Sequence, residues 1–148
     1  MARSSIWAAV FLLALAACQR ADPLGRVRAE CGNEALAPSA QAQACATLIE
    51  SGNLEGADHA AALANAGAAH ARAGDTGAAL RDFAGALALD DANARALEGR
   101  ARILIASGQF DAAEPLVDRL IASNEAGARA HLLQGQIAAG RSDFAAAL

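Results

Sequence analysis

The chain has 148 residues, of which 45 are alanine and only three are proline, and it contains no tyrosine. These proportions favour closely packed helices over sheets of branched and aromatic residues, and the length has room for one domain with a modest core. All 12 basic residues are arginine and 16 residues are acidic, so the formal charge of −4 excludes the basic footprint of a nucleic-acid-binding protein.

Residues 1–17 have the layout of a secretory signal peptide. Arg3 supplies a positive charge, a run of 12 apolar residues extends from Ile6 to Ala17, and small residues precede Cys18. Because a membrane-crossing helix needs about 20 apolar residues, we expect this segment to direct export rather than to remain as a span.

The four residues Leu15-Ala16-Ala17-Cys18 resemble the lipobox of bacterial lipoproteins. The resemblance implies cleavage before Cys18 and attachment of lipid to its sulfur, with acyl chains such as palmitate that would anchor the protein essentially permanently. Gln19 is not aspartate, which in this family implies sorting to the outer membrane. We therefore expect a protein anchored at the periplasmic face of the outer membrane, with this covalent lipid and no other cofactor.

Residues 18–30 are predicted to form a tether behind the lipid. They include Pro23, Gly25 and three arginines, and the interpretation as a tether assumes that they lack a helical apolar spacing. Their arginines could also lie against anionic lipid head groups.

Cysteine counting predicts a disulfide. If Cys18 carries lipid, Cys31 and Cys45 remain as a pair that should join in an oxidising periplasm, closing a loop worth about 3 kcal/mol. A redox-active pair is disfavoured because 13 residues separate the two cysteines instead of two. His59 and His70 could share a helical face, but packed or solvated histidines explain them better than a metal site, so we expect no metal.

From residue 60 onward the sequence repeats at a constant interval of about 34 residues. Gly74 matches Gly108, Ala79 matches Ala113, and Phe110 matches Phe144. The pattern resembles the tetratricopeptide repeat, a helix-turn-helix unit with small, glycine and aromatic residues at set places. The resemblance implies an all-α, tetratricopeptide-type α-solenoid of antiparallel helical hairpins. Its repeats would be residues 60–93, residues 94–127 and a partial third repeat at 128–148, which would stop a few residues into its second helix.

Small residues in this pattern should let the helices of a hairpin approach, while larger ones fill the gap to the next repeat. Glycine should end the first helix of each pair, and Asn93 should cap the helix that follows it. Pro115 is expected in the first turn of a helix. The predicted repeat-packing residues are Gly67, Gly74, Ala79, Phe83, Ala86, Ala101, Gly108, Ala113, Gly135 and Phe144.

Residues 31–59 are predicted to be a disulfide-pinned leader that caps the array. Cys45 stands one repeat interval before Ala79, so the stretch from Ser39 to Glu50 should be the second helix of a degenerate hairpin. Similar leader helices precede the repeats in some members of the family. At the other end no polar capping helix follows, which favours a fragment of a longer array over a truncated gene or an edge that docks on a partner.

The family resemblance implies that the first helices of the repeats line a concave groove that binds a peptide or helix of another protein. Four of the eight residues expected there are arginine, so an acidic segment or a free C-terminus is a plausible ligand. The predicted groove residues are Asn65, Arg72, Arg95, Glu98, Arg102, Arg129, Leu132 and Gln136.

Enzyme classes find no support in the sequence. It offers no nucleophile with a base, no metal cluster and no phosphate-binding loop, so we expect neither catalytic residues nor a small-molecule substrate. The alternative to groove binding is a structural adaptor that strengthens an outer-membrane, pilus or secretion assembly.

Overall fold

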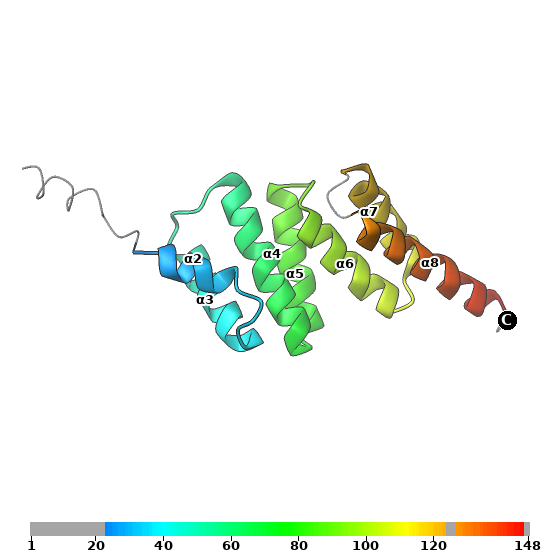
Figure 1. Cartoon of the computed structure of the whole chain (residues 1–148), viewed down its shortest axis with the longest axis horizontal. Helices are drawn as coiled ribbons and strands as arrows, with labels where there is room; N and C mark the ends of the chain where they lie inside the picture. The colour runs from blue at the N-terminus through cyan, green and yellow to red at the C-terminus, as the bar shows by residue number, and fades with distance from the viewer. Residues whose placement is uncertain (1–22, 124–126, 147–148) are drawn as a thin grey trace, which may run out of the picture.

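The protein is an elongated row of helices. A computed structural model describes residues 23–123 and 127–146, with side chains to residue 142. The described residues contain seven α-helices and no β-strand, which confirms the predicted all-α class (Figure 1). The helices are α2 (Gly25–Cys31), α3 (Pro38–Glu50), α4 (Gly56–Ala73), α5 (Thr76–Leu89), α6 (Ala94–Ala106), α7 (Phe110–Ala122) and α8 (Ala128–Ala146).

Consecutive helices pair as antiparallel hairpins that stack along the long axis of the molecule (Figure 1). Helix α2 packs on α3, α4 on α5, and α6 on α7, while α8 packs on α7 and α6. The first helices of successive pairs also contact one another, since α4 contacts both α2 and α6, and α6 contacts α8. Among the described helices, α5 and α7 do not contact each other. The first helices of successive hairpins therefore lie closer together than these two second helices do.

Glycine and capping residues set the turns inside and between the hairpins. Gly74 ends α4 with φ +84°, and Gly108 follows α6 with φ +72°, both in the left-handed region that favours glycine. Asp75 then accepts a hydrogen bond from the backbone N–H of Ala78 at the start of α5. Asn93 caps α6 in the same way, as predicted, by accepting from the backbone N–H of Ala96 at 3.1 Å.

The Phe83 ring fills the contact between the first two repeats. It is 1% exposed, and glycines face it from α4 and from α6. A Cβ built on Gly67 would lie 2.8 Å from the ring, and one built on Gly99 only 2.2 Å, so each neighbouring backbone lies where a side chain would stand. Four of the alanines predicted to pack the repeats are completely buried: Ala79, Ala86, Ala101 and Ala113. Thin and bulky residues therefore interlock as expected.

Helix α2 corrects the predicted tether, which is wrong from Gly25 onward. Leu24, Val27 and Cys31 are spaced by three and four residues, a helical apolar spacing that the tether interpretation overlooked. Leu24 and Val27 pack against the apolar cluster that contains Cys31. Burial of this stripe explains why the segment is helical.

Helix α8 corrects the predicted end of the third repeat. The turn expected near residue 142 does not form, because α8 runs without interruption from Ala128 to Ala146. Ser142 stands one repeat interval after Gly108, and a side chain there makes the left-handed turn unfavourable. Gly135 is exposed on α8 with no atom within 4 Å of a Cβ built on it, so its predicted packing role is also wrong. The side chain of Phe144 lies outside the described residues.

Pro115 lies one turn deeper in its helix than predicted. It is the sixth residue of α7, where a backbone N–H would bond to the carbonyl of Asp111. The residue is exposed, so water can satisfy that carbonyl.

No helix in the described ranges, 23–123 and 127–146, is both long and apolar enough to cross a membrane. The predicted signal peptide, the lipobox and Cys18 lie outside those ranges.

Candidate functional site

A cavity of about 520 Å³ opens along the first helices of the repeats. Helix α6 contributes six of its lining residues, and α4, α8 and Phe83 of α5 contribute others. Six of its twelve lining residues are charged: Glu34, Arg72, Arg95, Glu98, Arg102 and Arg129. We refer to this space as the arginine cavity.

Five of the eight predicted groove residues line the arginine cavity: Arg72, Arg95, Glu98, Arg102 and Arg129. The other three, Asn65, Leu132 and Gln136, are not part of its lining. Leu132 is instead 58% exposed on α8, and Gln136 is exposed on the same helix. Gly99, which was not predicted as a site residue, also lines the cavity. It packs directly on the Phe83 ring, which lines the cavity as well.

Glu98 holds two of the arginines across neighbouring repeats. Its carboxylate lies 2.9 Å from the guanidinium of Arg102 and 3.3 Å from that of Arg129, which belongs to α8. The Glu98 side chain is only 13% exposed, whereas Arg102 is 57% and Arg129 66% exposed. One carboxylate is thus shared by two guanidiniums that keep much of their surface toward solvent.

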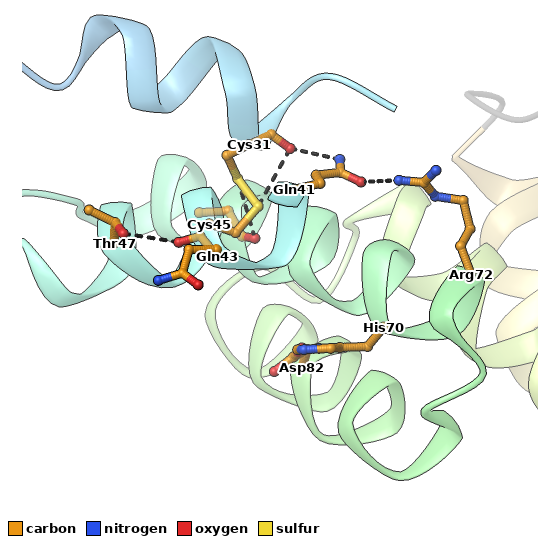
Figure 2. Close-up of a disulfide and its surroundings, with 9 residues drawn as sticks. Cys31, Gln41, Gln43, Cys45, Thr47, His70, Arg72 and Asp82 are labelled. Atoms are coloured by element: carbon orange, nitrogen blue, oxygen red, sulfur yellow. Dashed lines mark hydrogen bonds and ion pairs between the residues drawn. A yellow bond between two sulfur atoms is a disulfide. The ribbon is translucent and has the colours of Figure 1, made fainter. Parts of the chain in front are cut away.

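Arg72 binds the loop between α2 and α3. Its guanidinium donates to the backbone carbonyls of Glu34 at 3.0 Å and of Leu36 at 3.3 Å. It also donates to the side-chain oxygen of Gln41 at 2.5 Å. Figure 2 shows Gln41 between Arg72 and the backbone of Cys31, whose carbonyl accepts from the Gln41 amide at 2.8 Å. All four acceptors around Arg72 and Gln41 therefore belong to the leader hairpin and its loop.

Glu34 from the same loop forms an ion pair with Arg95 of α6. The hydrogen bond and the charge of Arg95 hold the pKa of Glu34 below its ordinary value, and the charges of Arg72 and Arg129 act in the same direction. Sequence reasoning missed Glu34 because 61 residues separate it from Arg95 and no local pattern connects them.

Cys31 and Cys45 form a disulfide next to this loop (Figure 2). Both residues are buried, Cys31 at the end of α2 and Cys45 within α3. The link fixes the start of the loop against α3, on the side where Gln41 receives Arg72. The disulfide, Gln41 and Arg72 thus form one connected support for the end of the arginine cavity.

The two histidines considered for a metal site lie apart from this cavity. Nδ1 of His70 is 2.7 Å from a carboxylate oxygen of Asp82, a contact that joins α4 to α5 (Figure 2). His59 is half-buried near the start of α4. Within the part of the chain that the structure describes, no group of three or more His, Cys, Asp or Glu side chains could hold a metal ion.

The charge of the arginine cavity opposes the charge of the chain. Four arginines and two glutamates give its lining a formal charge of +2, while the whole chain carries −4. Guanidinium groups bind carboxylates through paired, charge-assisted hydrogen bonds. The arrangement therefore suits a ligand with carboxylate groups.

A family model described as a tetratricopeptide repeat matches residues 70–137. The matched stretch includes α5, α6 and α7 entirely, and it confirms tetratricopeptide repeats in that part of the chain. No curated protein and no solved structure matches the chain significantly. Such repeats generally mediate protein–protein interactions and typically form modules without catalytic activity.

Proposed function

We propose that this tetratricopeptide-repeat protein binds an acidic segment of a partner protein in its arginine cavity. The observation that supports this best is the convergence of Arg72, Arg95, Arg102 and Arg129, from three successive first helices, on one cavity with only two carboxylates. A peptide that crosses the repeats would meet these guanidiniums in turn.

Arg102 and Arg129 are the groups best placed to receive the ligand. They share Glu98, so each has hydrogen-bonding capacity left, and both are more than half exposed. Glu98 supplies one negative charge against the two positive charges of Arg102 and Arg129, so a ligand carboxylate between them would neutralise the second. Because the groups are exposed, the attraction should weaken as the salt concentration rises.

The arginine cavity can be tested with a fluorescein-labelled peptide of six glutamates, measured by fluorescence anisotropy on the full chain in detergent. Replacing Arg95 and Arg102 by alanine should weaken binding about tenfold, which corresponds to ~1.4 kcal/mol. The matched control replaces Arg26 and Arg81, which are exposed and do not line the cavity, so that the net charge falls equally. Equal losses in both variants would refute a specific site and leave only long-range attraction.

The proposal includes a lipid anchor on Cys18 at the periplasmic face of the outer membrane. It rests on the lipobox resemblance of Leu15-Ala16-Ala17-Cys18. Since α2 begins seven residues after Cys18, the connecting chain can extend at most about 25 Å, and the leader hairpin would stay close to the bilayer. The arginine cavity would then face partners that lie near the membrane surface.

Replacing Cys18 by alanine tests the anchor. In envelope fractions of cells given radioactive palmitate, the variant should stay uncleaved and unlabelled, whereas replacing Cys45 should leave the label in place. Labelling of the Cys18 variant would disprove the anchor.

Crosslinking in envelopes distinguishes binding in the cavity from a structural adaptor. If the partner binds in the arginine cavity, the double variant at Arg95 and Arg102 should lose it, whereas a structural adaptor should retain it.

A further inference from the structure

The loop between α2 and α3, residues 32–37, lies at one end of the arginine cavity and presents three acceptors to it. The Glu34 carboxylate pairs with Arg95, and the carbonyls of Glu34 and Leu36 accept from Arg72. We propose that this loop is an internal competitor, which occupies the Arg95 end of the cavity as an acidic partner segment would. The inference rests on the proposed function of the cavity.

The contacts of the loop are those that an extended acidic peptide offers. Such a peptide carries backbone carbonyls at regular intervals and a carboxylate beside them, and the loop supplies two carbonyls and one carboxylate to two successive first helices. The arginines involved, Arg72 and Arg95, come from α4 and α6. Two of the four arginines of the cavity thus already donate to acceptors of this loop in the same chain.

The Glu34 contact is the part of the loop that a ligand can displace. The Glu34 side chain is 58% exposed and Arg95 is 43% exposed, so water screens their ion pair. The supports behind the loop are different, because Gln41 is completely buried and the disulfide between Cys31 and Cys45 is buried as well. A partner carboxylate can thus replace Glu34 on Arg95 while the leader hairpin stays folded.

Displacement of this kind lowers the apparent affinity for a ligand by the fraction of molecules in which Arg95 is accessible. Arg102 and Arg129 pair with Glu98 instead of with the loop and are more than half exposed, so a ligand can reach them whether or not Glu34 is displaced. The loop therefore makes the use of Arg95 depend on the number of carboxylates in the ligand. A segment with a single carboxylate can use the open arginines, and a longer acidic segment gains Arg95 only by expelling Glu34.

Glu34→Gln tests the competition, again with the hexaglutamate peptide and the full chain in detergent. Loss of the exposed ion pair should tighten binding about two- to fivefold. Glu50→Gln is the matched control, because Glu50 is an exposed carboxylate on α3 that does not line the cavity, and its binding should equal that of the unaltered protein.

Unchanged or weaker binding by Glu34→Gln would overturn the competition. If the variants at Arg95 and Arg102 lose the peptide at the same time, the proposed function survives that failure. Binding by Glu34→Gln alone, with none by the unaltered protein, would support the competition strongly. If no version binds the peptide, the acidic ligand is wrong and the competition falls with it.

Discussion

Replacing Gly99 by alanine should destabilise the protein, although alanine is the better helix former. A Cβ at this position would lie 2.2 Å from the Phe83 ring, and the backbone of Gly67 on α4 also packs closely on this ring, since a Cβ built there would lie 2.8 Å from it. Overpacking of this kind costs about 1–3 kcal/mol, and the gain in helix propensity returns about 0.5–1 kcal/mol. The middle values of these two ranges leave a net loss of about 1 kcal/mol in the free energy of unfolding.

Gly135→Ala is the matched control, with the opposite expected sign. Gly135 lies inside α8, is exposed, and has no atom within 4 Å of a Cβ built on its backbone. The same substitution should therefore raise stability by about 0.5–1 kcal/mol, because nothing opposes the gain in propensity. Urea unfolding of the full chain, followed by circular dichroism at the helical signal, measures both variants on one scale.

A double-mutant cycle identifies the cause. Phe83→Leu shrinks the ring, so it should cost less in the Gly99→Ala background than in the unaltered protein, with a coupling of about 1 kcal/mol. A Gly99→Ala variant as stable as the unaltered protein, or additive costs in the cycle, would refute the close packing of α6 on Phe83.

Three further predictions concern the ends of the helices and the leader hairpin. Replacing Asp75 or Asn93 by alanine should each cost about 0.5–2 kcal/mol in thermal unfolding, because each caps a helix. Reducing the Cys31–Cys45 disulfide should cost about 2–4 kcal/mol, seen as a lower melting temperature with reductant than without. Glu34 has a lowered pKa, so its ion pair stabilises the fold above the ordinary pKa and is lost as the pH falls through the lowered one. Glu34→Gln should therefore reduce the loss of stability between pH 6 and acid by less than about 1 kcal/mol, since the pair is exposed.

The constant repeat interval predicted the central hairpins because their packing depends on residue size. Gly67 and Ala79 are thin where helices approach, and Phe83 is bulky where repeats meet, so the spacing of sizes carries the three-dimensional arrangement. The same reasoning predicted five cavity residues, since side chains that recur on the first helices fall on one face of the array.

The sequence pattern failed where a single repeat departs from the rule or where contacts are distant. Ser142 stands at a turn position that needs glycine, and α8 continues through it. Pro23 and Gly25 are typical of a tether, but burial of Leu24 and Val27 against the cluster around Cys31 stabilises a helix there. Glu34 lies in a loop without a repeat partner, so only the folded arrangement places it beside Arg95.

The apolar core is divided into three clusters along the array, and Leu87 contacts both the second and the third. Helix packing joins each hairpin mainly to its neighbours, so strain must pass from one hairpin to the next. If the molecule is pulled between a bilayer and a bound partner, the hairpins should therefore yield one after another rather than all at once. Residues 31–45 would not extend under this load, because the disulfide between Cys31 and Cys45 closes them into a loop.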